Sequence, residues 1–209
     1  MTESSVKSSV PELVRQPHGG ALQRGIERLA VQHVGIPGMD VDVVEEIAAL
    51  ASRLSRRLRK RGWSIVTAES CTGGLIAGCL TAVAGSSDVV ERGFVTYSNE
   101  AKSEMLGVPA ELILRVGAVS EEVSRAMAEG ALIHSHAELA LAVTGVAGPG
   151  GGTQDKPVGL VHLSCARQSG VTQHERHVYE GDRDAVRWAT VGTALDMALA
   201  AVKSQTAVA

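Results

Sequence analysis

Aromatic residues are scarce in this sequence and neither sign of charge is in excess, and both features exclude classes of function. Aromatic residues make up 2% of the 209 residues, so the stacked aromatic platforms that bind single-stranded nucleic acid are disfavoured. Lys and Arg number 20 against 23 Asp and Glu, and the net charge of −3 offers no electrostatic footprint for DNA, RNA or an acidic membrane. We therefore expect neither a nucleic-acid nor a membrane partner.

Cysteine is also rare. Cys71, Cys79 and Cys165 are an odd number without CxxC spacing, which indicates neither a disulfide framework nor a zinc site. We expect no metal and no cofactor, since no HExxH motif or paired-carboxylate constellation is present either. No apolar run approaches the roughly 20 residues that span a bilayer, and the first thirty residues lack the apolar region of a secretion signal. These features predict a cytoplasmic protein.

The length permits one sizeable α/β domain with an appendage, and 44% hydrophobic residues are enough for its core. Residues 1–38 have weak periodicity and contain the helix breakers Pro11, Pro17 and Pro37, so we predict a disordered N-terminal extension there. We place the domain at residues 39–204. Its last helix is rich in Ala and Val, which favours a homo-oligomer, a dimer or higher.

Helical and strand patterns alternate along this domain. A helical stripe from Asp40 to Gly62 precedes a strand at 63–68, a helix from Leu75 and a second strand at 89–97. Two short helices and a longer one lead to a strand at 139–143, a glycine-rich loop, a hairpin over 158–179 and a final helix at 182–203. This order predicts a single compact α/β sandwich around a mixed sheet. Ligands bind beyond the carboxyl ends of such strands, so three loops should meet at one mouth.

The turn over residues 67–74, between the first strand and its helix, contains two candidate nucleophiles, Ser70 and Cys71. Backbone N–H groups that begin a helix lack partners and favour negative charge, and Gly73 and Gly74 allow close approach of a substrate. Taken alone, the turn suits an ordinary helix cap by Ser70 or Thr72 equally well.

A serine nucleophile needs a base, and Lys102 is the best-placed candidate. None of the seven histidines follows a strand-end turn beside Ser70. Lys102 follows the second strand, and partial burial would lower its pKa into the range of a general base. Tyr97 could relay the proton or hold the lysine neutral by hydrogen bonding. Without further evidence the set is weak, because lysines on helices are usually solvated.

Five strings make the pattern specific: TAESCTGG at 67–74, GFVTYSNEAK at 93–102, GAVS at 117–120, TGVAGPGG at 144–151 and KPVG at 156–159. In this order they resemble the C-terminal domain family of the competence/damage-inducible protein CinA, whose enzymatic members are nicotinamide-nucleotide amidases. The resemblance covers about residues 41–202. It implies hydrolysis of nicotinamide mononucleotide to nicotinate mononucleotide and ammonia, a step of pyridine nucleotide recycling. It also matches Ser70 to the nucleophile, Tyr97 to the proton relay and Lys102 to the general base.

The remaining candidate residues would bind the substrate. We assign the oxyanion hole to backbone N–H groups near Cys71, Thr72, Gly73 and Gly74, with Cys71 a packed neighbour rather than the nucleophile. Thr144 and Gly145 would shape the mouth and hold ribose or phosphate, and Arg183 and Arg187 are candidates for the 5′-phosphate, with plain surface charge as the alternative. Two other functions stay open: a non-catalytic nucleotide-binding or assembly module, and an amidase on another pyridine nucleotide.

Overall fold

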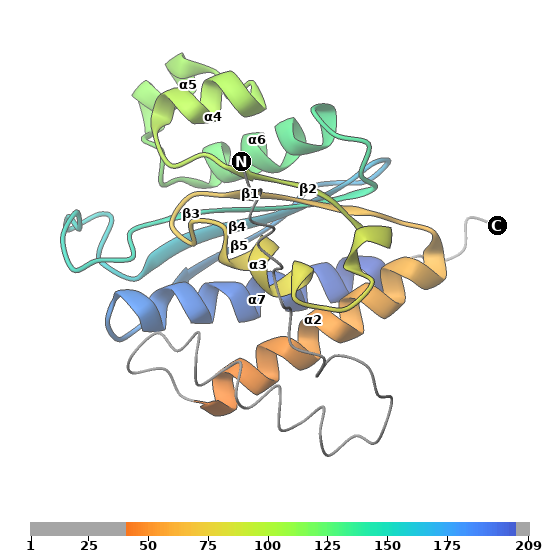
Figure 1. Cartoon of the computed structure of the whole chain (residues 1–209). Coiled ribbons are helices and arrows are strands. Elements are labelled where there is room, and N and C mark those ends of the chain that lie inside the picture. The colour runs from red at the N-terminus through yellow and green to blue at the C-terminus, as the bar shows by residue number, and fades with distance from the viewer. Residues whose placement is uncertain (1–40, 204–209) are drawn as a thin grey trace, which may run out of the picture. The chain divides into compact units, whose positions relative to one another are not determined.

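The computed structural model describes residues 41–203, in which a five-stranded mixed sheet lies between two layers of helices (Figure 1). The strand order is β2-β1-β3-β4-β5. Strand β1 is parallel to β2 and β3, β4 is antiparallel to β3, and β5 is antiparallel to β4. The predicted α/β sandwich around a mixed sheet is confirmed, whereas the extension predicted over residues 1–38 lies outside the described residues.

The elements follow the predicted order, with several boundaries shifted by one or two residues, and the shift at β2 concerns a site residue. Strand β2 ends at Val95, so Tyr97, which we expected at a strand end, lies in the loop before α4. The predicted hairpin is present, with Ser169 at φ 88 in its turn. The elements are α2 (Val41–Arg61), β1 (Ile65–Glu69), α3 (Leu75–Thr81), η1 (Ser86–Asp88), β2 (Val90–Val95), α4 (Asn99–Leu106), α5 (Ala110–Val116), α6 (Glu121–Ile133), β3 (Leu139–Gly145), β4 (Leu160–Arg167), β5 (Gln173–Val178) and α7 (Arg183–Lys203).

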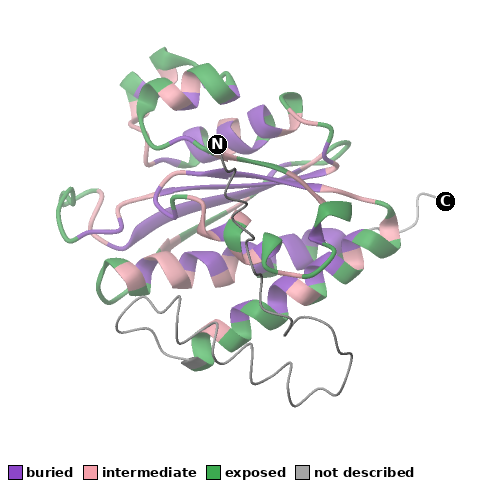
Figure 2. Ribbon diagram, viewed as in Figure 1, coloured by how far each residue is buried: buried purple, intermediate pink, exposed green. Residues whose placement is uncertain are grey.

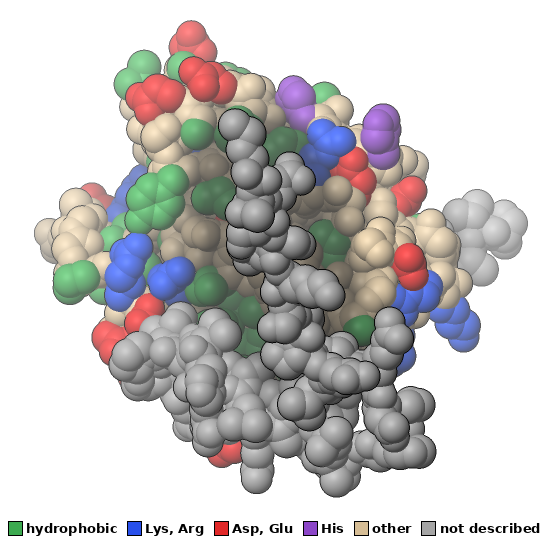
Figure 3. Space-filling model, viewed as in Figure 1, with side chains coloured by type: hydrophobic (Ala, Val, Ile, Leu, Met, Phe, Trp, Pro, Cys, Tyr) green, Lys and Arg blue, Asp and Glu red, His purple; other side chains and the backbone are tan. Residues whose placement is uncertain are grey.

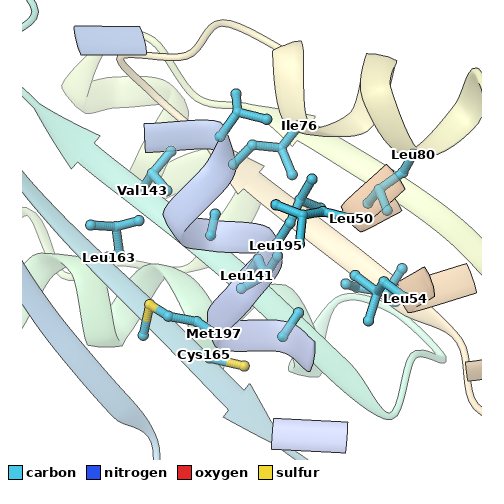
Figure 4. Packing of buried hydrophobic residues seen from close by; sticks show 14 of the residues in the cluster. Leu50, Leu54, Ile76, Leu80, Leu141, Val143, Leu163, Cys165, Leu195 and Met197 are labelled. Atoms are coloured by element: carbon cyan, nitrogen blue, oxygen red, sulfur yellow. The ribbon is translucent and has the colours of Figure 1, made fainter. Parts of the chain in front are cut away.

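Each face of the sheet has its own apolar core, and Figure 2 shows the buried residues concentrated in the sheet and on the helix faces turned toward it. Leu54, Ile76, Leu141, Leu163 and Leu195 meet between the sheet and helices α2, α3 and α7 (Figure 4). The other core lies under α4, α5 and α6 and is built mainly from small residues. Because β1 and β3 lie between the two cores, nearly all of their residues are buried.

Helix α7 is long and apolar enough, by length and composition, to cross a membrane. From the sequence we expected no apolar run of that length, so α7 is an exception to this expectation. Its place in the fold explains its composition, because 56% of the apolar stretch is buried inside the domain, where Val191, Leu195 and Leu199 belong to the core. This is the composition of a core helix, which packs on both its neighbour α2 and the sheet.

Helices α4 and α6 cross closely at Gly130. A Cβ atom at this position would lie 2.0 Å from the carbonyl oxygen of Leu106, the last residue of α4, so a larger residue would push the helices apart. This approach matters for function because α4 bears Lys102, and the depth of α4 against α6 sets how far that side chain reaches toward the sheet.

Candidate active site

Three parallel strands end at one edge of the sheet, as the sequence predicted. Ser70 follows β1 directly, and its amide donates a hydrogen bond of 3.1 Å to the carbonyl oxygen of Val143 in β3. Beyond β2, the amide of Thr96 donates to the carbonyl oxygen of Glu69 at 2.8 Å. The backbone of the neighbouring strands therefore fixes the residue after β1 on both sides.

The Glu69 side chain stabilises the turn over residues 67–74 by accepting hydrogen bonds. Its carboxylate is fully buried and accepts hydrogen bonds from the Thr72 hydroxyl at 2.7 Å and from the amides of Gly74, Ile76 and Ala77 at 3.1, 3.0 and 2.8 Å. A carboxylate at a helix N-terminus satisfies amides that lack intrahelical partners. This corrects the cap expected from Ser70 or Thr72: the N-cap position of α3 is Gly74, at φ 99, and no side chain caps it locally.

Lys102 reaches Ser70 from the opposite side. Its side chain is 1% exposed, and its Nζ lies 3.1 Å from Ser70 Oγ, 2.8 Å from the carbonyl oxygen of Thr96 and 3.4 Å from that of Ser98. Burial disfavours the charged ammonium and lowers the pKa of Lys102, while the nearby Cys71 and Glu100 raise it by less. The structure therefore joins the predicted nucleophile and the predicted base directly.

Cys71, the other candidate nucleophile, is packed into the core beneath the turn. Its side chain belongs to the core cluster, and burial raises the pKa of its thiol to about 12. Because only the thiolate is strongly nucleophilic, the sulfur is unreactive at neutral pH. Ser70, which is half-buried at the mouth, is the side chain of this pair that a substrate can reach.

Tyr97 lies apart from this pair. Its side chain is 62% exposed, and its hydroxyl accepts a hydrogen bond of 3.0 Å from Arg183 Nη2. Within residues 41–203 no hydrogen bond joins Tyr97 to Lys102 or to Ser70. The role of Tyr97 as a proton relay thus stays a prediction, which no contact with Ser70 or Lys102 in the described residues supports.

Arg183 and Arg187, the two expected phosphate ligands, fasten α7 to the loops of the mouth. Arg183 donates to the carbonyl oxygen of Gly148 at 2.9 Å as well as to Tyr97, and Arg187 donates to the carbonyl oxygen of Thr72 at 3.2 Å and to Asp184 at 3.1 Å. Figure 3 shows basic and acidic side chains together on the side of this face where α7 begins. Both guanidinium groups donate to protein acceptors, but Arg187 Nε is buried without a partner in the described part of the chain.

Thr144 and Gly145, at the end of β3, serve packing. The Thr144 hydroxyl is buried and donates to the carbonyl oxygen of Ala118 at 2.9 Å, which ties β3 to the loop before α6. A Cβ atom at Gly145 would lie 2.7 Å from the carbonyl oxygen of Leu160. Beyond them, the glycine-rich loop and the start of α7 enclose a cavity of about 460 Å³, lined by Ala147, Pro149, Val158 and Arg183 among others.

The amides of the turn are mostly engaged. The amide of Gly73 donates to the carbonyl oxygen of Ser70 at 3.1 Å, and that of Gly74 donates to Glu69. Of the four residues expected to supply an oxyanion hole, two therefore have amides committed to the turn itself. The amides of Cys71 and Thr72 donate to no oxygen atom in the described part of the chain, although both lie near the Cys71 sulfur and lower the pKa of its thiol by less than burial raises it.

The sequence also matches a known protein family. The family model of the CinA C-terminal domain matches residues 47–202. The chain belongs to the CinA C-terminal domain family. A crystal structure of the competence/damage inducible protein CihA from Agrobacterium tumefaciens is similar, with a TM-score of 0.74 and 52% identity, and the alignment covers 76% of this chain and 96% of that one.

Two curated relatives show how this CinA C-terminal domain relates to longer and shorter proteins. A CinA-like protein of Citrifermentans bemidjiense is 55% identical over 152 residues, 73% of this chain but 36% of the relative. The chain thus spans little more than a third of that relative. The nicotinamide-nucleotide amidohydrolase PncC of Escherichia coli K12 is 49% identical over 142 residues, 68% of this chain and 86% of the relative.

Sequence reasoning found the Ser70–Lys102 pair of this CinA domain, but not the contacts that support it. Glu69 stands beside Ser70 in the motif, and only the fold reveals that its carboxylate turns back to the start of α3. The link from Arg183 to Tyr97 spans 86 positions and has no local signal. No group of three or more His, Cys, Asp or Glu suited to a metal ion occurs among the residues that the structure describes.

Proposed function

We propose that this chain is an amidohydrolase that converts nicotinamide mononucleotide and water into nicotinate mononucleotide and ammonia. The observation that carries the proposal is the 3.1 Å approach of the buried Lys102 Nζ to Ser70 Oγ at the mouth of the sheet. The relative PncC, named a nicotinamide-nucleotide amidohydrolase, supports the choice of substrate. The name of the CinA-like protein of Citrifermentans bemidjiense states no substrate, so the substrate rests on the similarity to PncC.

The reaction begins with Lys102 as a neutral amine. Its two N–H groups then donate to the carbonyl oxygens of Thr96 and Ser98, and its lone pair accepts the Ser70 hydroxyl proton. Ser70 Oγ attacks the carboxamide carbon as that proton moves to Nζ. Lys102 returns the proton to the leaving nitrogen, the C–N bond breaks and ammonia departs, which leaves an ester on Ser70.

Water then hydrolyses the ester on Ser70, with Lys102 again transferring the proton. Lys102 takes a proton from the water that attacks the ester carbon, and it returns this proton to Ser70 Oγ as the C–O bond breaks and nicotinate mononucleotide leaves. Each tetrahedral intermediate carries a negative oxygen. We assign its stabilisation to the amides of Cys71 and Thr72, since those of Gly73 and Gly74 are engaged.

Ammonia release from nicotinamide mononucleotide tests this proposal. We expect turnover by the wild-type chain, loss of turnover in Ser70→Ala and Lys102→Ala, and unchanged turnover in Lys60→Ala, a control at an exposed site on α2. Wild-type protein that releases no ammonia between neutral and mildly alkaline pH would refute the substrate. A Ser70→Ala protein as active as wild type would refute Ser70 as the nucleophile, and a wild type that binds the nucleotide without releasing ammonia would favour a non-catalytic binding module.

The cytoplasmic location, the homo-oligomer and the small-molecule partner that we expected from the sequence remain proposals of the same kind. Because the chain covers 36% of the CinA-like protein of Citrifermentans bemidjiense, activities of that whole protein are not carried over to it.

A further inference from the structure

Two of the family strings, residues 117–120 and 156–159, play no part in the amidase chemistry, yet they meet in the fold. The ammonium group of Lys156 donates to the carbonyl oxygen of Val116 at 2.6 Å. A Cβ atom at Gly117, which has φ +78, would lie 2.6 Å from that same nitrogen, so the glycine leaves room for the ammonium group. The two strings form one wall of a cavity of about 570 Å³.

This cavity lies on the same face of the sheet as Ser70 and Lys102. The opposite wall includes His162 of β4 and Arg176 of β5, which are paired across the strands, and His162 is paired in turn with Thr144 of β3. Ser164, two residues along from His162, bonds to Ser124 of α6, so these alternate side chains point toward the α6 layer. Helix α4, which bears Lys102, belongs to that layer (Figure 1).

The register sets how far the cavity lies from the nucleophile. Glu69 pairs with Val143, so Ser70 and Thr144 stand at the same level of β1 and β3, and His162 and Arg176 continue that row on β4 and β5. Neighbouring strands lie about 4.8 Å apart, so His162 is about 10 Å, and the backbone of Arg176 about 14 Å, across the sheet from the end of β1. That span is comparable to the reach of a mononucleotide from its base to its phosphate.

Two cations in the cavity have no carboxylate partner. No ion pair within 4.0 Å involves Lys156 or Arg176 in the described range, and Lys156 is half-buried. An ammonium group has three donors, and Val116 accepts from one of them. Arg125, the third cation, is paired with Glu121 at 2.8 Å.

Glu121, Glu122 and Asp155 also line the cavity, so its carboxylates equal its three cations in number. All three carboxylates are exposed, as is Arg176, whereas Lys156 is half-buried. His162 accepts or donates a hydrogen bond of 3.0 Å with His174, and burial lowers the pKa of His162 to about 4, so it is uncharged at neutral pH. A neutral imidazole and a partly buried ammonium suit a compact anion that supplies several acceptor oxygens.

We propose that this cavity takes the 5′-phosphate of the mononucleotide whose carboxamide lies at Ser70, with Lys156 and Arg176 as its ligands. The inference rests on the proposed amidase function. It moves the phosphate away from Arg183 and Arg187, whose Nη groups donate to oxygen atoms of Gly148, Tyr97, Thr72 and Asp184, although Arg187 Nε is buried without a partner in the described part of the chain. The nucleotide then runs from Ser70 to Lys156 outside the loop that contains Ala118, because Thr144, which lies between them in the row, is buried against that loop.

Steady-state kinetics with two substrates tests the assignment. For Lys156→Met and Arg176→Met we expect KM for nicotinamide mononucleotide to rise about 10- to 100-fold with kcat nearly unchanged, the range of a lost charge-assisted hydrogen bond. Turnover of nicotinamide riboside, which lacks the phosphate, should not change. Lys60→Met is the matched control. If Arg183→Ala abolishes the preference for the nucleotide over the riboside and Lys156→Met preserves it, the assignment is wrong.

Binding by Ser70→Ala protein separates this inference from the amidase proposal. Calorimetry should show that nicotinamide mononucleotide binds, that inorganic phosphate competes with it, and that Lys156→Met weakens both. Phosphate that binds at Lys156 without competing with the nucleotide would mean a separate phosphate-bearing ligand, and would overturn the inference while leaving the amidase intact. Absent turnover in the wild type, with nucleotide binding at Lys156 retained, would overturn the amidase alone.

Discussion

Lys102 Nζ lies 3.1 Å from Ser70 Oγ although the two residues are 32 positions apart in the chain. Two features of the fold bring them together. The β1–β2 pairing places the loop after β2 beside the turn after β1, and the close crossing at Gly130 presses α4 against α6. A lysine on a short helix, which the sequence alone would leave solvated, is thereby buried next to a hydroxyl.

The first prediction concerns pH. Burial lowers the pKa of Lys102 below its ordinary value of 10.5, and only the neutral amine accepts the Ser70 proton. Activity should rise with pH as Lys102 loses its proton, and this rise should be absent from whatever activity Lys102→Met retains. A profile with no rising limb between neutral pH and pH 10 would contradict the role of Lys102 as base.

The same shift has a consequence for folding. The unfolded chain binds a proton at Lys102 up to about pH 10.4, whereas the folded chain releases it at lower pH, so the free energy of unfolding should increase with pH between the two pKa values. Below the pKa of Lys102 in the folded chain, the buried charge lowers the free energy of unfolding by a constant amount. Urea unfolding at several pH values should show this slope in the wild type and a smaller one in Lys102→Met.

Glu69→Gln should destabilise the domain. The carboxylate accepts from a hydroxyl and three amides, whereas an amide side chain turns one NH₂ group toward those donors. We expect a loss of about 2–3 kcal/mol in the free energy of unfolding. Glu46→Gln, on the exposed face of α2, should change it by less than about 0.5 kcal/mol. Equal effects of the two substitutions would show that the cap on α3 is not structural.

The cysteines should be inert in the folded protein. Burial raises the pKa of Cys71 and Cys165 to about 12 and that of Cys79 to about 11. Iodoacetamide at pH 8 should therefore leave activity intact and label the thiols only after unfolding. Rapid inactivation with label on Cys71, prevented by bound substrate, would restore Cys71 as a candidate nucleophile.

Tyr97→Phe separates a proton relay from a structural contact. The hydroxyl touches Arg183 and not the Ser70–Lys102 pair, so its loss should lower kcat/KM less than about tenfold, the effect of one hydrogen bond. A proton-transfer residue contributes about 10²–10⁴-fold. A fall of kcat by that larger factor, with the protein still folded, would support the relay that the family resemblance implied.

The sequence predicted the fold well because the strong signals are local. The apolar runs of β1 and β3 and the breaks at Gly62 and Gly107 place most elements within a few residues. Tyr97 was misplaced because Thr96 and Tyr97 have strand-forming side chains, whereas the chain leaves the sheet at Val95 so that Thr96 and Ser98 can bond to Lys102. The contacts of Arg183 and Lys156 join distant segments and cannot be read from spacing.

The most direct test of the account is a double-mutant cycle on ammonia release from nicotinamide mononucleotide. Nucleophile and base act as one unit, so Ser70→Ala and Lys102→Met should each lower kcat by about 10³-fold or more, and the double variant should be no slower than the worse single variant. Losses that multiply in the double variant, or a Ser70→Ala protein that retains activity close to the wild type, would contradict a lysine-activated serine in this protein.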